Sequence, residues 1–323
     1  MFIGITGTLA SGVDEVIKYL VHELGFRLLT LDSQSRDLYH GLSSFESFKT
    51  PAEMHSFATS HWYENFVMIA DLSSEELENF LKRPFFLLVS VDGSIASRYE
   101  RYKKGQSDSK CVTLEQFVAK SEELKYQNDC ILLQNIERAQ LKLINNTKTT
   151  ESLYEQLTAL DLQDPERLRP AWDSYFMSLA NLAALRSNCM KRRVGCVIVR
   201  QNRVIATGYN GTPRNFKNCN EGGCPRCNSC DSSGVGLSTC LCLHAEENAL
   251  LEAGRDRIGS DAAVYCNTCP CLTCSIKIVQ TGIREVIFSQ SYSMDKLTSK
   301  VFKQSGVILR QFTPARSGIV IIE

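Results

Sequence analysis

The chain has no long hydrophobic run. Apolar residues make up 43% of its 323 residues, yet no stretch approaches the length of about 18 apolar residues that a membrane-spanning helix needs. Residues 1–7 also lack the basic region and the long apolar region of a secretory signal. We therefore expect an intracellular protein with no membrane partner, in the cytoplasm and also in the nucleus.

An excess of charge of either sign is also missing. The sequence holds 36 basic and 36 acidic residues, which gives a formal net charge of +0. A protein that holds a nucleic-acid polymer needs a basic surface to bind many phosphates. We therefore expect a small-molecule substrate and no nucleic-acid partner.

Cysteine, in contrast, is abundant. In a reducing compartment the 14 cysteines are expected to be thiols and metal ligands rather than disulfides. Twelve of them lie between Cys189 and Cys274, which assigns the metal chemistry to the C-terminal half.

The most specific pattern is a histidine and a glutamate followed by two cysteines. His-Ala-Glu at 244–246 precedes Pro-Cys-Leu-Thr-Cys at 270–274. Cysteines three positions apart lie on one face at the start of a helix, where proline is favoured. One imidazole and two thiolates suit tetrahedral zinc and leave the fourth position to water. The pattern predicts a catalytic zinc held by His244, Cys271 and Cys274.

Glu246 is not needed as a ligand in this arrangement. It is free to take a proton from a water whose pKa zinc lowers from 15.7 to about 7, and to deliver it to a ring nitrogen and then to a departing amine. The combined pattern is typical of zinc nucleobase deaminases. It predicts hydrolytic loss of ammonia from a cytosine-like or adenine-like ring. The alternative is a structural zinc knuckle with Glu246 on the surface, but a closed structural site needs four protein ligands.

The C-terminal half predicts an α/β three-layer sandwich, because strands and helices alternate along it. The expected helices cover 172–188, 244 onward, 270–280 and 295–304, and the expected strands cover 194–199, 203–207, 263–266, 285–289 and 307–311.

The N-terminal half begins with a strand at 2–6, a glycine-flanked loop at 7–12 and a helix at 13–24. This order resembles the phosphate loop of P-loop kinases. The resemblance fails where Val13 replaces the phosphate-binding lysine and Asp14 replaces the magnesium-binding hydroxyl. We expect a degenerate P-loop kinase-like α/β domain, retained for regulation, assembly or weak nucleotide binding. A plain α/β domain with a tight first turn is the alternative.

Residues 142–169 are polar and predict a linker with one short helix. We place the domain boundary there, which gives a kinase-like domain at 1–160 and a zinc deaminase domain at 161–323.

Four segments together resemble the deoxycytidylate (dCMP) deaminase family, and the long N-terminal half resembles its fungal form. The segments are Val-Gly-Cys-Val-Ile-Val at 194–199, Gly-Tyr-Asn-Gly-Thr-Pro at 208–213, His-Ala-Glu-Glu-Asn-Ala at 244–249 and Pro-Cys-x-x-Cys at 270–274. The resemblance covers about residues 172–315. It implies a cytidine deaminase fold with a five-stranded mixed sheet, and hydrolysis of dCMP to dUMP and ammonia, which supplies dUMP for dTTP synthesis.

The resemblance also implies roles for particular residues. Asn210 would contact the nucleotide sugar, and the amides of Ala245 and Cys271 would face the pyrimidine ring. Family members are hexamers that dCTP activates with magnesium and dTTP inhibits, so Tyr209 and Asn210 are candidate effector contacts. Alternatively, the glycines of 208–213 only permit a turn. Candidates for the phosphate contact are Arg186, Arg192, Arg193, Arg214 and Tyr292.

A second metal site is expected in the cysteine-rich loop that precedes His244. Some phage and bacterial relatives carry a structural zinc whose ligands match Cys189 and Cys219. We add Cys224 and Cys240, with Cys227 close behind. The loop has little apolar content of its own and would gain order from a tetrahedral zinc. Free thiols are the alternative.

Two other functions remain open. The chain could be a deaminase of a free nucleoside, of guanine or of the riboflavin pathway, because only the 208–213 loop and the cysteine-rich insert indicate the nucleotide. It could also be a nucleotide-sensing regulator that retains a zinc fold, which the intact Glu246 disfavours.

Overall fold

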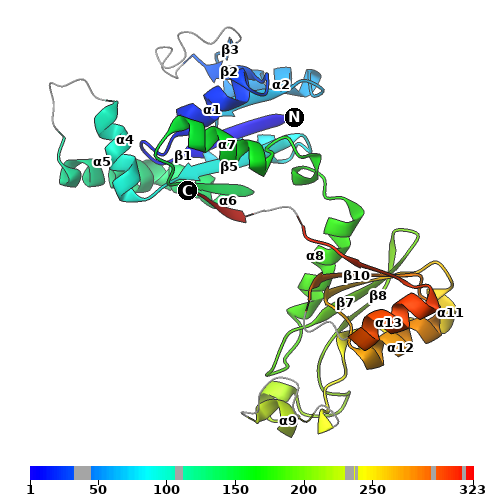
Figure 1. Ribbon diagram of the computed structural model, residues 1–323. Helices are drawn as coiled ribbons and strands as arrows, with labels where there is room; N and C mark the ends of the chain where they lie inside the picture. Colours follow the sequence, from blue (N-terminus) through cyan, green and yellow to red (C-terminus); the bar gives the residue numbers. More distant parts are fainter. Residues whose placement is uncertain (33–44, 106–111, 230–235, 237–238, 292–295, 315–317) are drawn as a thin grey trace. The chain divides into compact units, whose positions relative to one another are not determined.

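The computed structural model describes all residues except 33–44, 106–111, 230–235, 237–238, 292–295 and 315–317. The chain divides into two compact units, the first made of Met1–Arg169 with Ala315–Glu323 and the second of Pro170–Pro314 (Figure 1). Among the residues described, no helix has both the length and the apolar character needed to cross a membrane.

The first unit is built on a seven-stranded parallel sheet of order β12-β6-β5-β1-β4-β2-β3. Its strands are β1 (Phe2–Gly7), β2 (Arg27–Leu31), β3 (Phe45–Phe48), β4 (Phe66–Ile69), β5 (Phe86–Asp92), β6 (Leu141–Asn145) and β12 (Gly318–Ile322). The central strands are buried almost throughout, as expected of a parallel sheet with helices on both faces.

Helices cover both faces of this sheet. Apolar residues of α1 (Val13–His22) and α7 (Thr150–Leu160) pack in one core cluster, and those of α2 (Pro51–Ser60) and α3 (Ser74–Leu81) pack in another. The remaining helices of the unit are α4 (Ile95–Lys104), α5 (Leu114–Tyr126), α6 (Ile131–Arg138) and the short 3-10 helices η2 (Asn128–Cys130) and η3 (Pro165–Arg167).

The predicted linker at 142–169 is wrong for most of its length. Leu141 and Leu143 are buried in strand β6, and Leu153 and Leu157 of α7 are buried in the core. Polar residues alternate with these leucines, so the segment has a polar average although one face of each element is apolar.

The domain limits also differ from the predicted ones. The division lies between residues 169 and 170 rather than at 160, and residues 315–323 belong to the first unit. There β12 pairs with β6 in parallel, from Gly318 opposite Leu141 to Ile322 opposite Asn145. A short apolar strand far along the chain completes the sheet because the edge of β6 offers unpaired backbone groups.

The second unit contains a five-stranded mixed sheet of order β11-β10-β9-β7-β8. The strands β7 (Gly195–Arg200) and β8 (Arg203–Tyr209) form an antiparallel hairpin, while β9 (Ala263–Thr268), β10 (Glu285–Gln290) and β11 (Ile308–Gln311) run parallel to one another. Gln201 and Asn202 turn the hairpin with φ of 50° and 56°, as a two-residue type I′ turn requires. All five predicted strands are present.

The second unit has three layers, as predicted. The helix α8 (Trp172–Ala184) packs on one face of the sheet. The other face is covered by α10 (Ala245–Ala253), α11 (Arg255–Ile258), α12 (Leu272–Thr281) and α13 (Lys296–Ser305). Between β8 and α10 the chain forms the 3-10 helix η4 (Cys219–Glu221) and the short helix α9 (Pro225–Asn228).

Candidate metal and active site

Two helix N-termini bring the predicted zinc ligands together. His244 directly precedes the first residue of α10, and Cys271 directly precedes the first residue of α12, with Cys274 in its first turn. The backbone N–H of Ser275 donates to the carbonyl of Cys271 at 2.9 Å, which closes that turn. The partial positive charge at each helix start favours thiolates and a bound anion.

The distances among these three side chains fit a zinc ion. The Nδ1 atom of His244 lies 3.3 Å from Sγ of Cys271 and 3.4 Å from Sγ of Cys274, and the three ligand atoms lie within 4.8 Å of one another. Zinc bonds of about 2.0–2.1 Å to nitrogen and 2.3 Å to sulfur give a tetrahedral N···S edge of about 3.6 Å. The residues can therefore hold zinc with little movement.

Glu246 lies beside these ligands and is buried. Its side chain belongs to the first turn of α10, the residue is 4% exposed, and burial raises the pKa of its carboxyl above the ordinary value. The backbone of His244 is held in place at the helix start, because its N–H donates to the carboxylate of Glu247 at 3.0 Å. The site thus combines three soft or borderline ligands with one desolvated carboxylate.

Gly208 allows strand β8 to approach this helix closely. A Cβ atom at Gly208 would lie 2.1 Å from the carbonyl oxygen of Ala245 and 2.5 Å from the backbone nitrogen of Ala249. Any side chain would push the first turn of α10 away from the sheet. The glycine of the predicted 208–213 loop is therefore required for the position of the site helix.

A cavity of about 210 Å³ opens beside the ligands. It is lined by His244, Ala245, Glu246 and Cys271 from the two helix starts, and by the following residues of neighbouring segments: Cys189, Lys191, Arg192, Val194, Asn210, Arg226, Cys227, Cys240, Cys242, Leu243, Thr268 and Cys269. The predicted substrate contacts Asn210 and Ala245 both lie on its wall.

The amide of Asn210 is already occupied by its own chain. Its Oδ1 accepts from the N–H of Val194 at 2.8 Å and from the Ser187 hydroxyl at 2.7 Å, and its Nδ2 donates to the carbonyl of Arg192 at 2.8 Å. Asn210 therefore fixes the segment that carries Cys189 and Arg192 along the cavity.

The predicted effector contact Tyr209 lies at the end of β8 and is half-buried. Its carbonyl oxygen accepts from the side-chain amide of Asn248 on α10 at 3.0 Å. The 208–213 loop is thereby linked to the helix that carries Glu246.

Basic side chains reach the cavity, but only one of them was a predicted phosphate contact. Arg192 lines it, together with Lys191 and Arg226, which the sequence analysis missed. Arg186, Arg193 and Arg214 are absent from the described lining, and Tyr292 lies outside the residues described. Their sequence positions could have identified them, because Lys191 is two positions from Cys189 and Arg226 is two positions from Cys224.

The cysteine-rich loop gathers more thiols than predicted. Of the described residues, Cys189, Cys219, Cys227 and Cys242 form one set whose sulfur atoms lie within 4.8 Å of one another, and Cys224, Cys227, Cys240 and Cys242 form a second such set. The four predicted ligands (Cys189, Cys219, Cys224 and Cys240) are divided between the two sets. Cys242, which was not among the predicted ligands, belongs to both sets.

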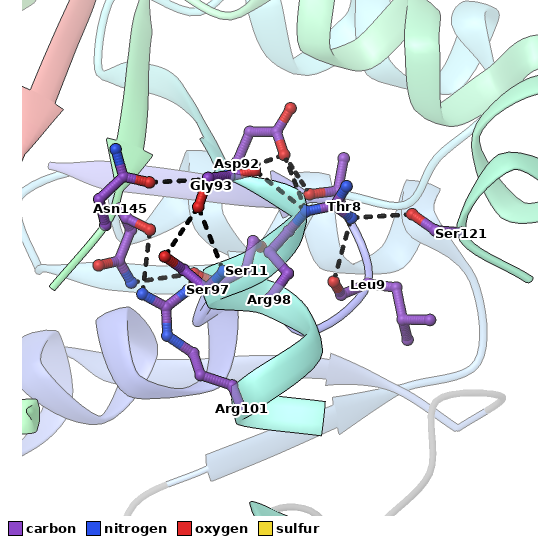
Figure 2. Close-up of polar contacts among 12 residues, drawn as sticks. Thr8, Leu9, Ser11, Asp92, Gly93, Ser97, Arg98, Arg101, Ser121 and Asn145 are labelled. Carbon is purple, nitrogen blue, oxygen red and sulfur yellow. Dashed lines mark hydrogen bonds and ion pairs between the residues drawn. The ribbon is translucent and has the colours of Figure 1, made fainter. Parts of the chain in front are cut away.

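The glycine-flanked loop of the first unit is held by arginines from α4 (Figure 2). Arg98 donates to the carbonyl of Leu9 at 3.3 Å, and Arg101 donates to that of Ser11 at 3.3 Å. The amide of Asn145 also donates to the Ser11 carbonyl, at 2.9 Å. Beside the loop lies a cavity of about 820 Å³, with Asp14 on its wall.

Comparison with known proteins places this fold and site in a class. Residues 170–290 match the family model described as the cytidine and deoxycytidylate deaminase zinc-binding region. The match spans both helix starts, the cavity segments and the cysteine-rich loop.

Similarity over the whole chain is more specific. The chain is 50% identical to a deoxycytidylate deaminase of Schizosaccharomyces pombe, over 98% of this chain and 99% of that protein, and 47% identical to one of Saccharomyces cerevisiae, over 97% of each. A deoxycytidylate deaminase of Mycobacterium phage D29 is 43% identical over 37% of this chain and 95% of its own length. The chain belongs to the deoxycytidylate deaminase family and shares its full length with the fungal members.

Proposed function

We propose that this enzyme hydrolyses dCMP to dUMP and ammonia. The observation that carries the proposal is the position of Glu246, a buried carboxylate on the cavity wall directly beside His244 and Cys271. The full-length fungal relatives, which carry the name deoxycytidylate deaminase, support the same substrate.

His244, Cys271 and Cys274 would hold the catalytic zinc through one nitrogen and two sulfurs. A zinc ion held there would supply hydroxide at neutral pH, because bound water has its pKa lowered from 15.7 to about 7. The helix starts that carry these ligands would favour zinc-bound thiolates, since their unpaired N–H groups stabilise negative charge.

Glu246 moves the protons of the reaction. Its carboxylate takes a proton from the attacking water and delivers it to the ring nitrogen, while oxygen adds to C4 of the cytosine ring. Glu246 then takes the proton of the hydroxyl added at C4 and delivers it to the amine as the C4–N bond breaks, which releases ammonia and leaves the carbonyl of dUMP. Because the carboxylate is buried on the cavity wall, a substrate in the cavity is its nearest proton acceptor.

The basic residues of the cavity support a nucleotide rather than a nucleoside. Lys191, Arg192 and Arg226 line it together with Glu246. A 5′-phosphate carries between one and two negative charges at neutral pH and pairs strongly with lysine and arginine. A nucleoside would present nothing to these cations, so the cavity fits dCMP better than deoxycytidine.

The test is ammonia release from cytidine, deoxycytidine, CMP, dCMP and dCTP, each supplied separately, with and without dCTP as effector. We expect turnover of dCMP and little of the nucleosides. Turnover of deoxycytidine but not of dCMP would refute the proposal.

We further propose regulation by dCTP with magnesium as activator and by dTTP as inhibitor, in a hexamer, with Tyr209 and Asn210 near the effector. The hydrogen bond from Asn248 to the Tyr209 carbonyl supports this, because it joins the 208–213 loop to the catalytic helix. Light scattering should give six chains per particle, and dCTP should lower the dCMP concentration at half-maximal rate. A monomer that ignores dCTP would refute the regulatory proposal alone.

We propose that the first unit is a kinase-like domain without phosphoryl transfer, retained for assembly or regulation. Asp14 stands beside the loop where a phosphate would bind, and the Arg101 guanidinium is committed to the carbonyls of Ser11, Asn145 and Thr147.

We also propose that the protein works in a reducing compartment, the cytoplasm or nucleus. The many cysteines without a disulfide support this.

A further inference from the structure

Six cysteine sulfurs of the second unit form one continuous cluster. Its two sets of four overlap, since Cys227 and Cys242 belong to both. Cys189 and Cys219 complete the first set, and Cys224 and Cys240 complete the second. A single tetrahedral ion accepts four protein ligands, so one ion would leave two of these six thiols without a metal.

We propose that two zinc ions bind in this cluster and that Sγ of Cys227 and Sγ of Cys242 bridge them. Each ion then has four sulfur ligands, two of its own and the two that are shared. This goes beyond the single structural zinc that the family resemblance implied. With the catalytic ion, the chain would hold three zinc ions.

The spacing of the sulfurs supports the bridged arrangement. Zinc–sulfur bonds of about 2.3 Å give a tetrahedral S···S edge of about 3.8 Å. The Sγ atom of Cys227 lies 3.8 Å from that of Cys189, 3.6 Å from that of Cys240 and 3.9 Å from that of Cys242. Cys227 therefore has edge-length neighbours on both sides, as a bridging thiolate needs.

Hydrogen-bond donors and one cation surround the cluster. Six thiolates and two zinc ions leave two negative charges. Backbone N–H groups approach the sulfurs, from Met190 to Cys219 at 3.5 Å and from Leu241 to Cys224 at 3.4 Å. The guanidinium of Arg226 interacts with Cys227 and Cys240. Such donors and a cation would offset part of the negative charge of a zinc–thiolate cluster.

The cluster also forms part of the substrate cavity. Cys189, Cys227, Cys240 and Cys242 line the same cavity as His244 and Glu246. The basic residues Lys191, Arg192 and Arg226 are within three positions of one of these cysteines in sequence. Metal binding would therefore fix the residues that we propose hold the phosphate. This consequence rests on the proposed function, whereas the metal count does not.

The test counts metal in the full-length protein, purified without chelators, by inductively coupled plasma mass spectrometry. We expect three zinc ions per chain in the wild type and two in His244→Ala, which removes a catalytic ligand and keeps all six cluster cysteines. Cys130→Ser, a change to a half-buried cysteine of the first unit, should retain three and serves as the matched control.

X-ray absorption of the His244→Ala protein then tests the bridge. We expect four sulfur neighbours per zinc and a zinc–zinc scattering contribution. One ion or none in this variant, or two ions without zinc–zinc scattering, would overturn the proposal. Because both readouts ignore turnover, an enzyme that failed to deaminate dCMP would leave the metal result intact, and the reverse also holds.

Discussion

The Nδ1 atom of His244 lies 3.3 Å from Sγ of Cys271, although 27 residues separate them in the sequence. The two residues directly precede α10 and α12, which pack against each other on one face of the sheet. Their contact therefore depends on the two helices starting at the same edge of the sheet. Glu246 is the second residue of α10, so the position of this helix start also places its side chain.

Replacing Glu246 with glutamine should remove catalysis and leave the metal. Glutamine keeps the shape but cannot accept a proton, so we expect kcat to fall by about 10²–10⁴-fold or more. Ammonia release gives the rate and mass spectrometry gives the zinc content. Glu252→Gln, on the exposed face of the same helix, is the control. Near-normal turnover of Glu246→Gln would contradict the proton-transfer role.

Arg192→Ala should weaken the binding of dCMP more than its turnover. Loss of a charged hydrogen bond to phosphate costs about 1.5–3 kcal/mol, so KM should rise by about 10- to 100-fold. Residual activity on deoxycytidine should be unchanged, because that substrate has no phosphate. Arg186→Ala removes an exposed arginine that is not in the described cavity lining, and should leave KM as it is. Equal losses with both substrates would mean that Arg192 acts on something other than the phosphate.

Asn210→Ala should destabilise the second unit and raise KM together. The change removes the partners of the Val194 N–H and the Arg192 carbonyl, which should cost about 1–3 kcal/mol of unfolding free energy. Urea unfolding and steady-state kinetics measure the two effects. If stability were unchanged while dCMP binding was lost, Asn210 would contact the sugar, as the family resemblance implied, rather than fix the loop.

Asp173 should make the second unit sensitive to acid. Its carboxylate accepts from both Nη atoms of Arg310, at 2.6 and 3.1 Å, and from the Tyr265 hydroxyl at 2.8 Å. The hydrogen bonds from Arg310 hold the pKa of Asp173 below its ordinary value.

A carboxyl with a lowered pKa in the folded state stabilises the protein fully above its ordinary pKa of about 3.9, and this contribution is lost as pH falls through the lowered value. Asp173→Asn should therefore lower the unfolding free energy by about 1 kcal/mol at pH 7, a modest value because the pair is partly exposed. The difference from wild type should shrink below about pH 4. A difference that is constant from pH 7 to pH 3 would exclude the ion pair as its cause.

Introducing the lysine that phosphate loops carry tests whether the first unit is a kinase-like domain. In Val13→Lys with Asp14→Ser, a cation and a hydroxyl replace the residues that depart from the phosphate loop, and we expect ATP affinity to rise by about tenfold. Isothermal titration calorimetry measures it, and Val13→Met with Asp14→Ser, which lacks the cation, is the control. No gain over this control would favour a plain α/β domain.

The sequence predicted that His244, Cys271 and Cys274 share one site, and the structure brings their side chains together. The positions of Cys271 and Cys274 on one helix turn, and of His244 and Glu246 at another helix start, follow from backbone geometry. The five strands of the second unit also follow from local pattern. The sequence predicted the first unit less completely, since polar residues between the apolar ones of β6 and α7 made both elements look like a linker.

What the sequence by itself determined is which residues are candidates to hold zinc and to move a proton, because that chemistry depends on side-chain type and on neighbours within one turn. The tertiary structure decided which distant groups share a site. It joined β12 to the sheet of the first unit, brought Lys191 and Arg226 to the cavity, and placed Cys227 and Cys242 where two sets of sulfurs overlap. These contacts form between segments far apart in the chain, and their partners are fixed by packing of the sheet and its loops rather than by spacing.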